Sequence, residues 1–92
     1  MRESEIEREL RERVQALGGM CIKVEAIGFR GFFDRLVVLP GGWIRFVELK
    51  RPKGGRLSVH QKYLIERFTE LGAGATTAVI RNSKDIDRLL SC

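Results

Sequence analysis

A short turn between two apolar segments constrains the fold of this chain more than any other feature of its sequence. Residues 34–39 (DRLVVL) and 43–50 (WIRFVELK) are rich in valine, isoleucine, leucine and aromatic side chains, as strands are. Between them, residues 40–42 (PGG) form a turn that is too short to join two parallel strands. The two segments are therefore predicted to form an antiparallel hairpin.

Patterns on both sides of the hairpin complete the predicted fold. Apolar residues at helical spacing predict helices, and glycines mark where these helices end. In chain order we expect a helix over 4–17, strands over 20–26, 34–39 and 43–50, a helix over 58–71, a strand over 75–80, and a short helix capped by Asn82 or Ser83 and ending near Leu90. The crossover over 43–80 should be right-handed, which makes the fourth strand parallel to the third. The prediction is an α/β fold with a mixed sheet flanked by helices.

Composition excludes several classes of protein. The 92 residues suffice for a single domain over 1–92. The net charge of +5 suits a polyanionic partner, although many small proteins are basic without one. The two cysteines, Cys21 and Cys92, and the single histidine provide neither a zinc site nor a disulfide framework, so Cys21 is expected to be a small buried apolar residue. No apolar stretch approaches the ~20 residues of a membrane span, and the charged N-terminus does not resemble a signal peptide, which predicts a soluble cytoplasmic protein.

The register of the hairpin predicts a pair of carboxylates. If Leu39 pairs with Trp43, counting back along both strands places Asp34 opposite Glu48. Side chains that face each other in this way lie ~5 Å apart at Cβ, close enough to share one divalent ion. Two carboxylates at this spacing repel each other unless a cation or a proton lies between them. We therefore expect a Mg²⁺ site here, with Mn²⁺ as an alternative, because Mg²⁺ prefers oxygen ligands and retains several waters.

The sequence Glu48-Leu49-Lys50 adds a cation to this pair. Alternate residues of a strand share a face, so Glu48 and Lys50 project together, and the backbone carbonyl of Leu49 is a candidate further metal ligand. Such a site favours metal-assisted phosphodiester hydrolysis, in which Lys50 orients or deprotonates the attacking water and stabilises charge on phosphorus. The competing interpretation is an ordinary surface Glu-Lys pair, with Asp34 as a turn residue.

These segments together resemble the PD-(D/E)XK nuclease superfamily, and more narrowly the stand-alone virus-type replication-repair nuclease (VRR-NUC) domain. The resemblance covers nearly the whole chain and is carried by EIERELRERVQALGG (5–19), GFRGFFDRLVVLPGG (28–42) and FVELKRPKGGRLSVHQ (46–61). It implies a restriction-endonuclease-like αβββαβ core and a catalytic set of Asp34, Glu48 and Lys50. Phe33 stands where the superfamily name has proline, and this substitution removes no chemical group that the reaction needs.

The resemblance also implicates a glutamate of the first helix, best matched by Glu7, as a metal ligand, and Gln61 as a catalytic residue. Each has a structural alternative. Ser4-x-x-Glu7 and Ser58-x-x-Gln61 both fit a capping box, in which the fourth residue bonds back to the first amide of the helix. Glu7 can in addition pair with Arg11 one turn further on. Both roles remain open for each residue at this point.

Basic residues flank the predicted site. The candidates for binding phosphate groups of DNA are Arg30, Arg35, Arg51, Lys53 and Arg56. A solvated basic loop is the alternative for any one of them. His60 is expected to be incidental, and Trp43 and the phenylalanines are expected in the core or in an interface rather than stacked on bases.

The resemblance implies a structure-selective DNA endonuclease, with four-way (Holliday) junctions as the expected substrate. Resolving a junction takes two symmetric cuts, so a chain with one site is expected to act as a homodimer with twofold symmetry. Neither a membrane nor a small-molecule cofactor is expected. The alternatives are cleavage of flap, single-stranded or duplex DNA, a non-catalytic DNA-binding module of the same fold, and a small interaction protein with a basic surface.

Overall fold

The computed structural model describes residues 1–25 and 28–91. Its elements are α1 (Glu3–Ala16), β1 (Met20–Lys23), β2 (Arg35–Leu39), β3 (Trp43–Leu49), α2 (Val59–Glu70), the 3-10 turn η1 (Gly74–Thr76), β4 (Thr77–Ile80) and α3 (Ser83–Leu90). The predicted order of helices and strands is confirmed. β1 is shorter than the predicted strand over 20–26, whose residue 26 lies outside the described residues, and η1 takes the place of the predicted start of β4.

The four strands form one mixed sheet in the order β1-β2-β3-β4. β1, β2 and β3 pair antiparallel, and β4 runs parallel to β3, as predicted. Leu39 lies opposite Trp43, and Arg35 lies opposite Val47 at the other end of the hairpin. The predicted register is therefore confirmed from Leu39 to Arg35. Asp34 directly precedes β2, one residue beyond the last strand pair, so its position opposite Glu48 stays a prediction.

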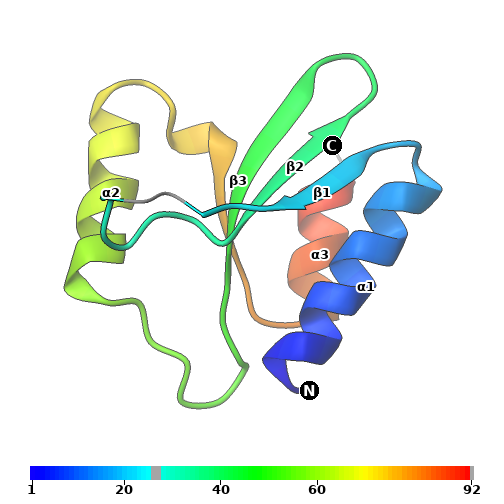
Figure 1. The fold of residues 1–92 in the computed structure, drawn as a ribbon, viewed down its shortest axis with the longest axis horizontal. Coiled ribbons are helices and arrows are strands. Elements are labelled where there is room, and N and C mark those ends of the chain that lie inside the picture. The colour runs from blue at the N-terminus through cyan, green and yellow to red at the C-terminus, as the bar shows by residue number, and fades with distance from the viewer. Residues whose placement is uncertain (26–27, 92) are drawn as a thin grey trace.

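The helices cover the sheet from both sides. α2 lies on one side of the sheet, and α1 and α3 lie together on the other (Figure 1). The core between the sheet and the helix pair consists of Ile6, Leu10, Val14, Val37, Val47, Leu49, Ile80, Ile86 and Leu89. Val47 and Leu49 both point into this core, so Glu48 between them points toward the side of α2. The fold class predicted from the sequence is confirmed.

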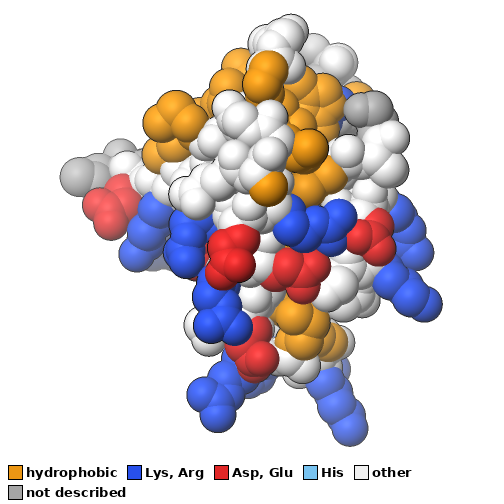
Figure 2. Space-filling model, turned by 90° about the vertical axis from the view of Figure 1, so that its right-hand side faces the viewer, with side chains coloured by type: hydrophobic (Ala, Val, Ile, Leu, Met, Phe, Trp, Pro, Cys, Tyr) orange, Lys and Arg blue, Asp and Glu red, His pale blue; other side chains and the backbone are white. Residues whose placement is uncertain are grey.

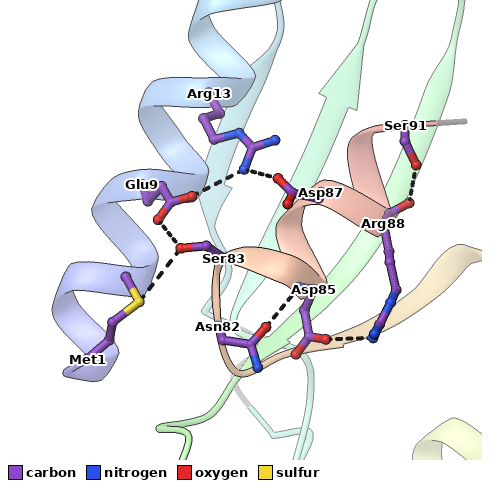
Figure 3. Close-up of polar contacts among 9 residues, drawn as sticks. All are labelled: Met1, Glu9, Arg13, Asn82, Ser83, Asp85, Asp87, Arg88 and Ser91. Atoms are coloured by element: carbon purple, nitrogen blue, oxygen red, sulfur yellow. Dashed lines mark hydrogen bonds and ion pairs between the residues drawn. The ribbon is translucent and has the colours of Figure 1, made fainter.

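α1 and α3 are joined by polar contacts as well as by apolar packing. Glu9 accepts a hydrogen bond of 2.6 Å from the hydroxyl of Ser83, and Arg13 forms an ion pair of 2.7 Å with Asp87 (Figure 3). Acidic and basic side chains lie next to one another across this face of the molecule, while hydrophobic side chains gather at its upper end (Figure 2). The predicted helix over 4–17 includes Leu17, but α1 ends at Ala16 and the Leu17 side chain is half exposed.

The start of α1 corrects one prediction. The helix begins at Glu3, and Glu5 accepts a hydrogen bond of 2.8 Å from the backbone N–H of Arg2. Ser4 therefore lies inside the first turn and does not cap the helix with Glu7. Glu5 takes this role because it stands three residues after Arg2, the spacing that a reciprocal capping contact needs.

An aromatic cluster fills the space between the sheet and α2. Phe33 is buried and contacts Phe46 on β3 and Phe68 on α2, with ring centroids 5.8 and 5.3 Å apart. The predicted helix over 58–71 includes Leu71, but α2 ends at Glu70 and Leu71 is 64% exposed. Cys21 contacts the core but is only half-buried. Within residues 1–25 and 28–91, no helix has the length and apolarity that crossing a membrane requires.

Candidate active site

Glu48 is a charged side chain placed inside the protein. It stands near the end of β3 and is 2% exposed. Its Oε2 atom has two partners, the Lys50 ammonium at 3.3 Å and the Gln61 side-chain amide at 2.5 Å. Its Oε1 atom is buried and has no hydrogen-bond partner among the described residues. One oxygen of this carboxylate is thus fixed by the protein, and the other has no hydrogen-bond donor among the described residues.

Asp34 is held at the same end of the hairpin. Its Oδ2 atom accepts a hydrogen bond of 2.9 Å from the backbone N–H of Leu49, which fixes the carboxylate beside the last residues of β3. Burial and, next, the negative charge of Asp34 raise the pKa of Glu48 to about 7, although Lys50 acts in the opposite direction. The Asp34 carboxylate is therefore close enough to Glu48 to oppose the ionisation of Glu48.

This arrangement fits a divalent cation. The unpartnered Glu48 oxygen and the neighbouring Asp34 carboxylate are hard oxygen donors, and Mg²⁺ uses one or two carboxylates with water and phosphate for its other positions. The described residues contain no group of three or more His, Cys, Asp or Glu side chains arranged for a metal ion. The donor set therefore fits an ion that completes its coordination with water and substrate, and does not fit one enclosed by protein.

Gln61 caps α2 and also contacts Glu48. Its side-chain oxygen accepts a hydrogen bond of 2.8 Å from the backbone N–H of Ser58, and Ser58 accepts one of 3.1 Å from the N–H of Gln61. The predicted capping box of α2 is thus confirmed. The amide nitrogen of the same side chain donates to Glu48. Because the cap fixes the side chain, the amide is directed at Glu48 without further ordering.

Glu7 lies near Asp34 but is already paired. Both residues line an open cavity of ≈ 400 Å³ on the side of α1, together with Lys23, Arg35 and Leu49 among others. Each Glu7 carboxylate oxygen accepts a hydrogen bond from Arg11, at 2.9 and 3.1 Å. The predicted pairing with Arg11 is confirmed. A role for Glu7 as a metal ligand would require exchange of this partner.

The predicted phosphate-binding residues lie in three places. Arg35 donates a hydrogen bond of 2.9 Å to the backbone carbonyl of Asp34 and lines the cavity, so it stands directly beside the site. Arg51, Lys53 and Arg56 are exposed on the loop between β3 and α2. Arg30 is exposed on the loop before Asp34.

Two further basic residues border the site and were not predicted. Lys23 lies opposite Arg35 in the sheet and lines the same cavity as Asp34. Arg81 directly follows β4, and its side chain donates a hydrogen bond of 3.3 Å to the backbone carbonyl of Gly55, in the loop between β3 and α2. The predicted strand pairing could have indicated both residues. Lys23 lies on the strand next to β2, and Arg81 follows the strand next to β3.

Comparisons with known proteins identify the family. No family model matches the sequence. The chain is 36% identical over 90 residues to "Putative nuclease p44" of Acyrthosiphon pisum secondary endosymbiont phage 1, covering 98% of this chain and 92% of that protein. A solved structure described as "VRR_NUC domain" is similar with a TM-score of 0.86 and 36% identity, over 97% of this chain and 94% of that one. Fold and relatives together define a nuclease. The chain belongs to the VRR-NUC family.

Proposed function

We propose that this nuclease is a metal-dependent DNA endonuclease that cleaves four-way junctions as a homodimer, with Asp34, Glu48 and Lys50 as its catalytic residues. The observation that carries the proposal is that the two oxygens of Glu48 differ in their partners. Lys50 and Gln61 occupy one of them, and the other is buried without a partner. A carboxylate oxygen buried in this way is unfavourable unless a cation completes it.

The metal would be held by Asp34 and Glu48, with the Leu49 backbone carbonyl as a further ligand and Glu7 as a candidate after exchange of its arginine partner. Mg²⁺ is the expected ion, and Mn²⁺ is expected to replace it, because both accept oxygen ligands. When bound, the ion polarises the scissile phosphate and lowers the pKa of water. Every other step of the mechanism depends on side chains of the chain itself.

Lys50 and Gln61 both contact the Oε2 atom of Glu48. The Lys50 ammonium lies at the end of β3 and is 19% exposed, so it can reach both Glu48 and an incoming phosphate. There it orients the attacking water and stabilises the charge that develops on phosphorus. Gln61 is a positioning residue in this scheme, because it fixes one Glu48 oxygen and leaves the other for the metal ion.

Phosphate binding is assigned to the basic residues that surround the site. The predicted set is Arg30, Arg35, Arg51, Lys53 and Arg56, to which the structure adds Lys23 and Arg81 as neighbours. Cations spread on several elements suit contacts with the backbone of DNA, which fix its position without reading its sequence. Shape is then the property by which so small a chain selects its substrate.

The dimer follows from the geometry of the proposed substrate. A four-way junction is resolved by two symmetric cuts, and the proposed catalytic set of Asp34, Glu48 and Lys50 makes a single site in each chain. A homodimer with twofold symmetry brings two such sites to one junction. The proposal therefore links the oligomeric state to the pattern of cuts.

The test is cleavage of a labelled four-way junction beside flap, single-stranded and linear duplex controls, with Mg²⁺, Mn²⁺ or EDTA. Paired symmetric cuts that disappear with EDTA, and in Asp34→Ala and Lys50→Ala, are the expected result. Metal-dependent cutting of another substrate instead would replace the junction assignment and retain the site. Absence of cutting on every substrate, with DNA binding unchanged in both variants, would overturn the assignment of the catalytic residues.

A further inference from the structure

Phe29 is an aromatic side chain that faces solvent beside the candidate active site. It is 51% exposed, whereas Phe33, Phe46 and Phe68 pack against one another under α2. Exposure of a large apolar ring is unfavourable, and nothing in the local backbone requires a phenylalanine at this position. The ring therefore calls for an explanation in terms of what it contacts outside the chain.

Phe29 is exposed but firmly supported. Its ring packs edge-to-face on Phe32, with centroids 5.6 Å apart and an interplanar angle of 77°. Phe32 packs in the same manner on Phe33 and on Phe46. A continuous series of ring contacts thus runs from the exposed ring to the buried aromatic cluster. Such support leaves a ring in place to receive a flat partner with little loss of side-chain freedom.

The loop that carries Phe29 lies against the first turn of α2. Gly31 has φ of +76°, and a Cβ atom built on it would lie 2.6 Å from the His60 Cβ and 3.0 Å from the Gln61 nitrogen. Only glycine permits so close an approach. Gln61 contacts Glu48, and Asp34 follows Gly31 by three residues. The loop is therefore fixed next to the catalytic residues by its own backbone.

The surroundings of the ring favour a nucleic acid as its partner. Arg30 is exposed next to Phe29 in the chain, and its guanidinium lies 3.5 Å from the His60 ring nitrogen Nε2. Tyr63, one turn further along α2 from His60, is 60% exposed. Exposed aromatic rings interleaved with cations are the arrangement on which single-stranded bases stack while their phosphates are neutralised.

We propose that Phe29 is a base-stacking residue that receives an unpaired or unstacked base at the branch point of the substrate, and so contributes to the choice of branched over linear DNA. This inference rests on the proposed function and deepens it. In a continuous duplex every base is stacked on its neighbours, so presenting one to Phe29 is unfavourable. Bases at a branch have already lost part of this stacking, and a supported ring replaces it.

The experiment measures binding of DNA in EDTA, so that its result does not depend on cleavage. Wild type, Phe29→Ala and Phe29→Leu are compared on a four-way junction and on linear duplex of the same sequence. Leu71→Ala is the matched control, because Leu71 is a similarly exposed apolar residue at the opposite end of α2. Each protein is also measured on a junction whose branch-point nucleotides lack bases. Thermal unfolding and sedimentation are recorded for every variant.

We expect both Phe29 variants to lose affinity for the junction on the order of tenfold, with no change on linear duplex. Removal of the branch-point bases should weaken wild type by a similar factor and leave the Phe29 variants unaffected. Leu71→Ala should behave as wild type. If Phe29→Ala does not fold, Phe29→Leu decides the matter, because leucine retains the apolar bulk without a flat ring.

Three results would overturn the proposal. The first is junction affinity in the Phe29 variants equal to that of wild type, and the second is an equal loss on junction and duplex. The third is a change in oligomeric state, which would assign Phe29 to a contact between proteins. The cleavage panel separates these results from failure of the proposed function: junction-selective cutting that is unchanged in Phe29→Ala rejects only the stacking role.

Discussion

Two charged clusters of this molecule use their carboxylates in opposite ways. In the helix-pair cluster (Glu9, Arg13, Ser83 and Asp87), each carboxylate has a partner, and the Asp87 side chain is 63% exposed (Figure 3). In the candidate active site, Glu48 is buried, and one of its oxygens has no partner among the described residues.

The contrast shows where the fold retains an unfavourable charge. Paired charges at the surface stabilise the fold only slightly, because water already solvates them. A buried carboxylate beside a second one destabilises the folded state unless it binds a proton or an additional cation. The carboxylates of the helix-pair cluster are paired within the chain, whereas one oxygen of Glu48 has no partner among the described residues and is proposed to bind a metal ion. Substitutions in the two clusters should therefore differ in kind, affecting stability in one and chemistry in the other.

The largest effect is expected from removal of the Lys50 ammonium group. Lys50→Ala should lower the rate of cleavage by about 10²–10³-fold, the usual effect of losing one group that stabilises transition-state charge. Arg45→Ala is the matched control, since Arg45 lies on the same strand near its opposite end and stacks on Trp43. Single-turnover rates with excess enzyme are the measurement. An equal loss in both variants would contradict a local role for Lys50.

The next largest effect is expected in the pH dependence of stability, to which Glu48 of the candidate active site should contribute. The folded-state pKa of Glu48 is raised from 4.5 to about 7, so the folded protein binds more protons than the unfolded chain between these values. Without metal, the contribution of Glu48 to stability is therefore fully present below pH 4.5 and is lost as the pH rises through 7. The loss is on the order of 3 kcal/mol.

Glu48→Gln should abolish this loss, because glutamine does not ionise. Urea unfolding of wild type and variant across this pH range gives the difference directly, and Glu66→Gln, an exposed glutamate of α2, is the control. A difference between wild type and Glu48→Gln that does not vary with pH would show that Glu48 is not under electrostatic stress.

Substitutions at Ser58 and Gln61 distinguish the effect of the helix cap from the effect of the Glu48 contact. Ser58→Ala removes a hydrogen bond from the cap of α2 and should destabilise the protein by about 1 kcal/mol while cleavage is retained. Gln61→Ala removes the side-chain half of the capping box together with the Glu48 contact, while the backbone N–H of residue 61 still donates to Ser58, so it should lower both stability and the cleavage rate. Thermal unfolding and rate measurements on the two variants decide. Equal rates in both would leave Gln61 with capping alone.

The smallest effect is expected in the helix-pair cluster. Arg13→Ala removes contacts with Glu9 and Asp87, and the free energy of unfolding should fall by less than about 1 kcal/mol, and less again at high salt. The cleavage rate should not change. Urea unfolding at low and high salt checks the stability, and a cleavage rate altered in Arg13→Ala would mean that the two clusters are coupled.

The sequence predicts most of the fold because the hairpin turn sets a register that the other elements must follow. The opposition of Asp34 to Glu48 came from counting along two strands, and it agrees with the observed pairing of Leu39 and Trp43. The predicted capping box at the start of α1 is wrong because two glutamates, Glu5 and Glu7, each stand three residues after a possible first residue of the helix. Spacing alone does not show which of the two residues begins the helix.

Contacts between distant segments could not be predicted from spacing. That Gln61 caps α2 and also reaches Glu48 depends on how α2 packs on the sheet, which sequence patterns do not determine. The same holds for the exposure of Phe29, which was expected in the core or in an interface. Its ring is supported from behind by Phe32, and no local pattern distinguishes the exposed member of such a cluster from the buried ones.

The most direct test of the account is calorimetric titration of the protein with Mn²⁺ in the absence of DNA. The expected result is binding of one ion by wild type and by Arg13→Ala, with loss of binding in Glu48→Gln and in Asp34→Asn. The ion should also raise the unfolding temperature of the two binding proteins only. Unchanged Mn²⁺ binding in Glu48→Gln would contradict the claim that the unpartnered oxygen of Glu48 is held for a metal ion.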